Sequence, residues 1–144
     1  MTRIATFDPR ELYDEIERLG QMNLGDVGVN LPCRLNRAAY DALHEAGMLA
    51  CVGLFDGDAL VGYAVATVLP DMHHDRTIAN HDGIFIHPDY RRPRLGLRLM
   101  AALEATCKLR GATAIAWHAT PHTAFARLVS RLAKLEEFTF IKEL

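Results

Sequence analysis

The chain has 144 residues, of which 50% are hydrophobic, and a formal net charge of −2. This length and composition can supply one core, so we expect a single domain over residues 1–144. The near-neutral charge argues against a nucleic-acid partner. The N-terminus is too polar for a signal peptide, and charges or glycines interrupt every apolar run, so no membrane partner is expected. Three widely spaced cysteines favour reduced thiols and a cytoplasmic location.

The first third of the chain predicts a strand and two helices. A strand is expected over residues 3–7, and Asp8-Pro9-Arg10-Glu11 combines a capping aspartate, a proline at the first helical position and a capping-box glutamate. Gly20 is expected to end this helix. The glycine- and asparagine-rich residues 21–32 are expected to form a loop, and residues 37–46 form the second helix.

The middle of the chain predicts an antiparallel meander. Residues 49–55 and 59–69 are strand-like runs joined at Asp56-Gly57, which is a strong hairpin signal. Residues 71–80 form a polar connection. A third strand over residues 81–87 then continues the same sheet.

The rest of the chain predicts two helices that alternate with strands. Leu99, Leu103 and Cys107 recur at helical spacing in a helix that Gly111 ends. A strand over 112–118 must lie parallel to its predecessor because a helix intervenes. The final expected elements are a helix opened by Pro121, with an apolar stripe of Phe125, Leu128, Val129 and Leu132, and a terminal strand over residues 136–144. The predicted class is therefore α/β, with a mixed sheet of about six strands and about four helices.

A basic turn joins the third strand of the meander to the following helix. It carries Arg91, Arg92 and Arg94 just before Gly96. The first backbone N–H groups of a helix are unpaired and its dipole favours negative charge, so this unit predicts a phosphate site. The alternative is a solvated surface turn.

The same stretch, P-D-Y-R-R-P-R-L-G-L-R-L-M, resembles the signature of the GNAT N-acetyltransferase superfamily. In that family V-x-P-x-Y-R is followed by x-x-G-x-G/A and by a helix that holds the pyrophosphate of acetyl-coenzyme A. Arg91 matches the first Arg/Gln and Gly96 the last Gly/Ala, whereas Arg94 stands where the first glycine is expected. The closing stretch F-A-R-L-V-S-R-L-A-K-L-E-E-F-T-F-I-K-E-L is similar to the family's last helix and strand, with Ala133 at a glycine position and Val129 at a tyrosine position.

The resemblance implies acetyl-coenzyme A as co-substrate and no metal. Backbone N–H groups from Arg94 through Arg98 are expected at the pyrophosphate, although Pro93 cannot donate. The backbone of the preceding strand is expected along the pantetheine arm, and one N–H there polarises the thioester carbonyl. The candidate cofactor-binding residues are Phe85, Ile86, Arg91, Arg92, Arg94, Leu95, Gly96, Leu97, Arg98 and His122, with His118 as a further pocket-lining candidate.

Two neighbouring residues are candidates for the catalytic base. Asp82 comes first, since some family members place an acidic or histidine residue here, facing the acceptor. His81 comes second, because its ordinary pKa of roughly 6.5 suits proton removal near neutrality. In a regular strand the two face opposite sides and Asn80 shares the face of Asp82, whereas a bulge exchanges them. The alternatives are an Asp82 that only caps the strand and a solvated His81.

A metal site among the histidines is a weaker alternative. The sequence places six candidate ligands within fifteen positions, namely His73, His74, Asp75, His81, Asp82 and His87. No H-E-x-x-H motif or cysteine pair supports them, and acetyl transfer requires no metal.

The resulting hypothesis is an N-acetyltransferase that acetylates a primary amine by direct attack in a ternary complex. The acceptor is a small-molecule amine or a protein or peptide amine, and a homodimer is left open. No acid is expected for the leaving thiolate, because Val129 has no proton to give and Ser130 lies about 100° around the helix. The rival hypotheses are a catalytically reduced acyl-coenzyme A-binding or interaction module on the same fold and a small metal-binding protein.

Overall fold

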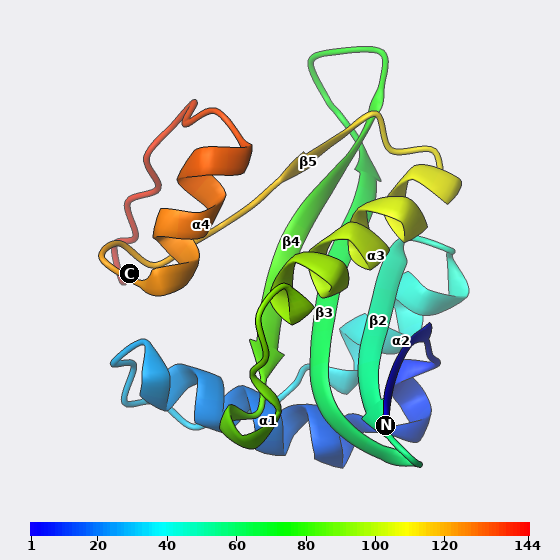
Figure 1. Ribbon diagram of the computed structural model, residues 1–144. Helices are drawn as coiled ribbons and strands as arrows, with labels where there is room; N and C mark the ends of the chain where they lie inside the picture. Colours follow the sequence, from blue (N-terminus) through cyan, green and yellow to red (C-terminus); the bar gives the residue numbers. More distant parts are fainter.

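A five-stranded mixed sheet forms the centre of the protein in a computed structural model that describes all 144 residues (Figure 1). The strands lie in the order β1-β2-β3-β4-β5. Neighbours among the first four are antiparallel, and β5 is parallel to β4, as predicted. The strands are β1 (Thr2–Thr6), β2 (Leu49–Asp56), β3 (Ala59–Pro70), β4 (Thr77–Ile86) and β5 (Ala114–Ala116).

Helices cover both faces of the sheet. In Figure 1, α3 crosses one face, while α1 and α2 lie on the other. None of the helices is both long and apolar enough to cross a membrane. The α-helices are α1 (Tyr13–Asp26), α2 (Arg37–Glu45), α3 (Leu95–Leu109) and α4 (Ala124–Leu132), and two 3₁₀ turns lie at Pro9–Glu11 and Pro88–Tyr90.

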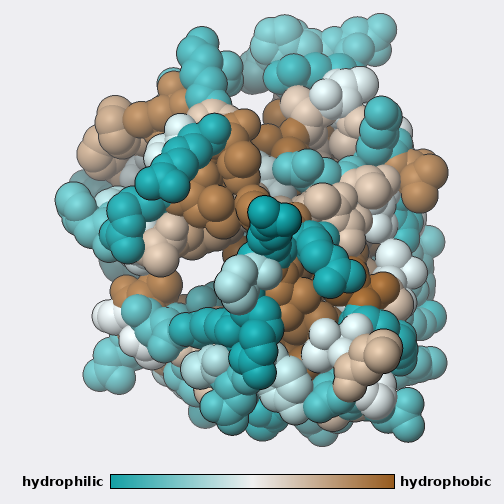
Figure 2. Space-filling view, in the orientation of Figure 1, coloured by the Kyte–Doolittle hydropathy of each residue, from teal (hydrophilic) through white to brown (hydrophobic).

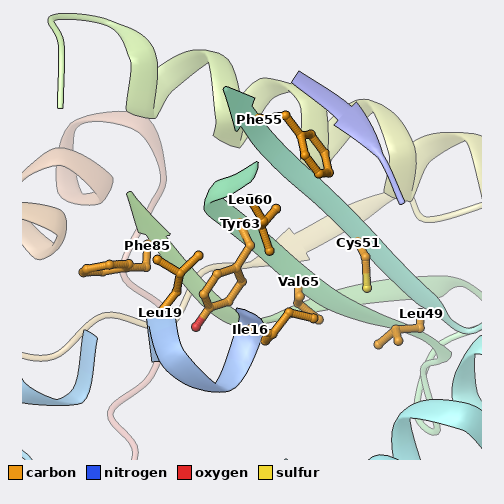
Figure 3. Packing of buried hydrophobic residues seen from close by; sticks show 9 residues of the cluster. All are labelled: Ile16, Leu19, Leu49, Cys51, Phe55, Leu60, Tyr63, Val65 and Phe85. Carbon is orange, nitrogen blue, oxygen red and sulfur yellow. The ribbon is translucent and has the colours of Figure 1, made fainter. Parts of the chain in front are cut away.

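Each face of the sheet has its own apolar core. On the α1 face, Ile16 and Leu19 of the helix pack with strand residues that include Tyr63 and Phe85 (Figure 3). On the other face, Leu99, Leu103 and Cys107 of α3 pack on alanines and valines of β2, β3 and β4. The small strand residues let the helix lie close to the sheet, so α3 is held firmly along its length.

The predicted hairpin is confirmed. β2 and β3 pair from Asp56↔Ala59 onward, and Gly57 in the turn has a positive φ of 59° that glycine tolerates. The predicted connection between β3 and β4, residues 71–80, is too long. β4 already begins at Thr77, which pairs with Pro70 of β3. Residues 77–80 therefore belong to the sheet.

The predicted end of the first helix is wrong. Asp8 caps only the 3₁₀ turn, and α1 continues through Gly20 to Asp26. Gly20 is buried inside the helix, where an added Cβ would lie 2.7 Å from Cys33 Sγ and 3.4 Å from the Tyr63 hydroxyl. The glycine permits a close approach and does not end the helix.

The predicted C-terminal strand is absent. The chain forms no strand after α4, and α4 itself begins at Ala124, three residues after Pro121, with Thr123 as its cap. Strand formation needs a partner edge, and Figure 1 shows the tail beside α4, apart from the sheet. Five large apolar side chains of this tail are exposed, namely Leu135, Phe138, Phe140, Ile141 and Leu144.

Candidate active site

A cleft opens where β4 and β5 separate. The two strands pair over only three rungs, the last being Asn80↔Ala116. After this rung β4 continues to Ile86, whereas the chain after β5 turns away toward α4 (Figure 1). Figure 2 shows an opening through the molecule between the α4 region and the α1 region below it. Half of β4 therefore has a free edge that faces this space.

Unpaired backbone donors lie at the end of the cleft near the start of α3. The N–H groups of Arg94, Gly96 and Leu97 donate to no acceptor. No side chain caps this helix, and its first turn has no acidic residue, whereas Asn36 caps α2 and Thr123 caps α4. Free N–H groups and the positive end of the helix dipole together favour an anion.

Fewer backbone N–H groups are free at the start of α3 than the sequence predicted. The N–H of Leu95 donates to the Arg92 carbonyl at 3.2 Å, and the N–H of Arg98 donates to the Arg94 carbonyl at 3.0 Å. The Leu95 side chain is buried against Leu54 and Val61. Leu95 therefore anchors the helix and offers neither its N–H nor its side chain to a ligand.

Arg94 and Gly96 shape the start of α3. Arg94 adopts the left-handed conformation, with φ 67° and ψ −7°, at a position where glycine is the unstrained residue. An added Cβ at Gly96 would meet no atom within 4 Å, so the space above this helix turn is open. A phosphate can therefore approach the backbone here.

The three arginines of the turn and Arg98 of α3 divide into two pairs. Arg91 donates through Nε to the Ile86 carbonyl at 2.9 Å and through a second nitrogen to Asp26 at 2.7 Å. Arg92 folds back onto two carbonyls of the turn. Arg94 and Arg98 are exposed and have no acidic partner. Only the second pair leaves its charge available to an anion.

The free edge of β4 presents Ile84 and Ile86. His87 donates to the Val61 carbonyl of β3 at 2.9 Å, and residues of an antiparallel strand alternate in direction. The backbone of Phe85 therefore faces β3, as its carbonyl oxygen near Gly62 confirms. The expected contribution of the Phe85 backbone is corrected to Ile84, which sequence reasoning missed because the direction depends on the pairing register.

A bulge in β4 separates the two candidate bases. The register shifts opposite Val65 and Ala66, which pair with Gly83 and His81 and leave Asp82 as the extra residue. Asp82 is exposed on the α1 and α2 face. Burial, and more weakly the Asp82 charge, raise the pKa of Tyr40 and Tyr63 on that face. Relative to Ile84 and Phe85 the bulge exchanges the two faces, because unbroken alternation would place Asp82 on the α3 face and His81 on the α1 face.

His81 lies on the opposite face, at the closed end of the cleft. It is buried, and its ring lies 5.0 Å from that of Trp117 and 5.5 Å from that of Phe125, between centroids. The backbone N–H of His118 donates to His81 Nδ1 at 3.2 Å. Burial, and next the charge of His118, lower the pKa of His81 to about 4, so the ring is neutral near pH 7. A solvated His81 is thus excluded.

The loop between α1 and α2 is fixed beside the Asp82 face. The Gln21 side chain accepts from the N–H of Cys33 at 2.7 Å and donates to the Leu31 carbonyl at 3.2 Å. Glu17 accepts from the N–H of Leu35. The loop position is therefore set by side chains of α1, and the loop includes part of residues 21–32, which the sequence predicted to form a loop.

The remaining candidates lie on the α4 side. His122 is exposed in the loop before α4 and adopts a positive φ of 65°. Val129 is half-buried, while Ser130 is exposed and its hydroxyl donates to the Arg127 carbonyl at 2.8 Å. No hydroxyl of this helix is thus directed into the cleft at these two positions.

The histidines of the sequence cluster are dispersed. His74 and Arg76 contact Asp71 in the loop after β3, and the N–H of Asp89 donates to His87. His81 faces β5 and α4 instead. The structure contains no group of three or more His, Cys, Asp or Glu side chains arranged to hold a metal ion.

Comparison with solved structures identifies the fold. An aminoglycoside acetyltransferase, meta-AAC0020, from an uncultured soil metagenomic sample is similar with a TM-score of 0.79 and 15% identity, over 99% of this chain and 96% of that chain. The ribosomal-protein-alanine N-acetyltransferase from Brucella melitensis biovar Abortus 2308 has a TM-score of 0.73 and 16% identity, over 100% and 99%. Aminoglycoside N-acetyltransferase AAC(6')-Iy, solved in complex with CoA, has a TM-score of 0.77 and 17% identity, over 99% and 95%.

The family itself is shown by sequence. A search of the curated proteins found no match. The model of the acetyltransferase (GNAT) family matches residues 11–130, which include the free edge of β4, the basic turn and all of α3. Because the match spans most of the chain and agrees with the fold, the protein belongs to the GNAT family of acetyltransferases.

Proposed function

We propose that the protein transfers an acetyl group from acetyl-coenzyme A to a primary amine by direct attack in a ternary complex. The observation that carries this proposal is the continuous path from the unpaired N–H groups of α3 to the free edge of β4. Similar folds solved with CoA, or with a bisubstrate analogue of CoA and acetylneamine, support the donor. The amine class is supported by the names of the aminoglycoside and ribosomal-protein-alanine enzymes.

The residues at the start of α3 fit a pyrophosphate. The N–H groups of Arg94, Gly96 and Leu97 hold its oxygens, and the guanidinium groups of Arg94 and Arg98 add charge. The open space above Gly96 admits the ligand. Along the cleft, the backbone of Ile84 and the N–H of Ile86 hold the amide groups of the pantetheine arm, since the Ile86 carbonyl already accepts from Arg91. Arg91 and Arg92 act indirectly, by fixing the turn.

Asp82 is the base in this proposal. When bound, acetyl-coenzyme A supplies an activated acyl group. Asp82 takes the proton of the amine, directly or through water, while the new C–N bond forms and the C–S bond breaks. The thiolate leaves with the electron pair and is protonated by water or by the incoming ammonium, because α4 offers no acid. Asp82 is exposed, so an amine can reach its carboxylate.

A matched pair of glycine variants tests the donor site. In Gly96→Asp a carboxylate occupies the proposed phosphate position, so calorimetry should detect at least a hundredfold loss of CoA affinity, on the order of 3 kcal/mol. An acidic residue in the first helical turn is compatible with folding. Gly25→Asp is the control, since Gly25 also lies in a helix with open space around it. Equal affinities in both variants contradict the assignment.

A second pair of measurements tests the base. Asp82→Asn should lower kcat by about a hundredfold or more and leave CoA affinity near normal, because the amide cannot accept the proton. The assay follows thiol release on a panel of aminoglycosides, peptides with free N-termini and simple amines. A normal rate in Asp82→Asn means that the amine loses its proton to solvent.

The alternative is an acyl-coenzyme A-binding module without turnover, as the absence of a hydroxyl at Val129 suggests. Wild-type protein that binds CoA but acetylates no amine in the panel supports this alternative. A homodimer stays a prediction that light scattering tests.

A further inference from the structure

His81 contains a buried donor without an acceptor. The residue is 7% exposed, and Nε2 is buried with no hydrogen-bond partner. Buried polar atoms are nearly always paired, so an unpaired one requires an explanation. The surrounding rings of Trp117, Phe125 and His118 offer no strong acceptor in contact with it.

The partner of the other ring nitrogen fixes where the proton lies. Because the backbone N–H of His118 donates to Nδ1, that nitrogen carries a lone pair and no proton. The lowered pKa keeps the ring neutral, which places the single proton on Nε2. Nε2 is therefore an N–H donor. It has no free lone pair with which to take a proton from an amine, so this tautomer is unsuited to act as a base.

The position of His81 relates this donor to the cleft. His81 follows Asn80, the last residue of β4 that pairs with β5, and His118 follows the paired Ala116 by two residues. The hydrogen bond from the His118 backbone N–H to the His81 ring thus closes the cleft immediately after the ladder ends. From Ile86 to His81 the strand runs about 15 Å, so a ligand anchored at α3 and extended along β4 presents its far end here.

We propose that His81 is a neutral hydrogen-bond donor to the thioester carbonyl oxygen of the acyl donor, and not the base of the reaction. The inference rests on the proposed function. An N–H aimed at this oxygen strengthens its bond as negative charge develops there during amine attack, and burial in an aromatic environment increases that effect. Because Nε2 is enclosed in the free protein, the weakly packed α4 side has to move for the carbonyl oxygen to reach it, and the bond then satisfies the unpaired Nε2.

NMR of isotope-labelled histidine ring nitrogens tests the contact without any turnover. The free protein should show His81 as the Nε2–H tautomer. Acetyl-coenzyme A should shift the Nε2 signal, whereas CoA, which has no acyl carbonyl, should leave it nearly unchanged. His118→Ala keeps the backbone N–H that defines the tautomer, and serves to assign the neighbouring signals. A protonated Nδ1, or equal responses to both ligands, overturns the proposal.

Two substitutions test the role in catalysis. His81→Phe keeps a ring in the aromatic cluster but removes the donor, so kcat should fall by about a hundredfold. His81→Gln keeps an N–H near the Nε2 position and should recover activity to within about tenfold of wild type. CoA affinity should change by less than about threefold in both variants. Phe and Gln variants of equal activity overturn the proposal.

The pH profile separates a donor from a base. The acidic limb of kcat/KM should be the same in wild type and His81→Gln, because the neutral donor does not titrate in the working range. Loss of that limb in His81→Gln reassigns His81 as the base. Wild-type protein that binds no CoA overturns both proposals, whereas normal CoA binding without a ring-nitrogen response to acetyl-coenzyme A overturns only this one.

Discussion

α3 and α4 each follow a strand that borders the cleft, but they are attached to the protein differently. α3 buries five residues, from Leu95 to Cys107, against the sheet, whereas α4 buries none. α4 is held mainly by Phe125, which packs on His81 and Trp117, and Trp117 in turn donates to Glu104 of α3. One wall of the cleft is therefore fixed by a core, and the other by a few aromatic contacts around one histidine.

This difference matches the two tasks that we propose for the site. The unpaired N–H groups at the start of α3 hold an anion without reorganisation only if the helix is fixed. The α4 side has to admit the rest of a long ligand. Because α4 makes few buried contacts, this helix can adjust its position. Figure 2 shows the result, with apolar surface gathered over the α4 region and an opening beneath it.

A leucine in each helix tests the comparison most strongly. Leu103 of α3 is fully buried, so Leu103→Ala should cost about 3 kcal/mol of unfolding free energy. Leu132 of α4 is 56% exposed, and Leu132→Ala should change stability by less than about 0.5 kcal/mol. Urea unfolding of both variants measures the difference. Similar losses mean that α4 is packed as firmly as α3.

The pH dependence of stability tests the contact that joins the two walls. The unfolded chain binds a proton at His81 below its ordinary pKa of 6.5, whereas the folded protein does so only near 4. The unfolded state thus binds more protons in this window, and stability falls as the pH falls through it, by about 2 kcal/mol at pH 5.

The His81→Phe variant is the control for this pH effect, since it cannot titrate. His118 is the titratable neighbour on the β5 side, and α4 contributes only Phe125 to the contact. Wild type and His81→Phe should therefore differ in the slope of stability against pH between about 6.5 and 4. Parallel curves show that His81 protonates without cost in the folded state.

A smaller effect is expected where α3 begins. Arg94→Gly removes the left-handed strain and should stabilise the protein by about 0.5 to 1 kcal/mol, after the greater freedom of glycine in the unfolded chain is subtracted. It should also weaken the salt dependence of CoA binding, because one charge is lost. Arg94→Ala removes the same charge but keeps the strain. Equal stability of the two variants contradicts the strained conformation.

The smallest effect is expected at the end of the chain. Deleting residues 134–144 removes five exposed apolar side chains and no buried one, so the unfolding free energy should change by less than about 0.5 kcal/mol. Binding of a hydrophobic dye should decrease, since the tail contributes much of the exposed apolar surface. A loss of more than about 2 kcal/mol means that the tail packs against the protein in solution.

Sequence reasoning succeeded where a local signal decides the structure. The hairpin at Asp56-Gly57, the parallel β5 after a helix and the start of α3 all follow from short-range chemistry. It failed where a distant partner decides. Gly20 was expected to end a helix because its role as a contact point for Cys33 and Tyr63 is visible only in three dimensions.

The same limit applies to the site. The motif predicted free N–H groups from Arg94 through Arg98, but Leu95 and Arg98 use theirs inside the protein. The choice of Ile84 over Phe85 depends on the pairing of β4 with β3, which no pattern in β4 encodes. The alternating residues 136–144 favour a strand, yet alternation supplies no partner edge.

Lysine cannot replace Arg91 without loss of contacts, although it carries the same charge. Its guanidinium contacts the Ile86 carbonyl, the Asp26 carboxylate and the face of Phe85, so it joins the turn, the end of α1 and the last part of β4. A lysine has one nitrogen and no planar fork, so it cannot make these three contacts together. Among relatives of this chain that keep an acidic residue at position 26, arginine and lysine are therefore not equivalent at position 91.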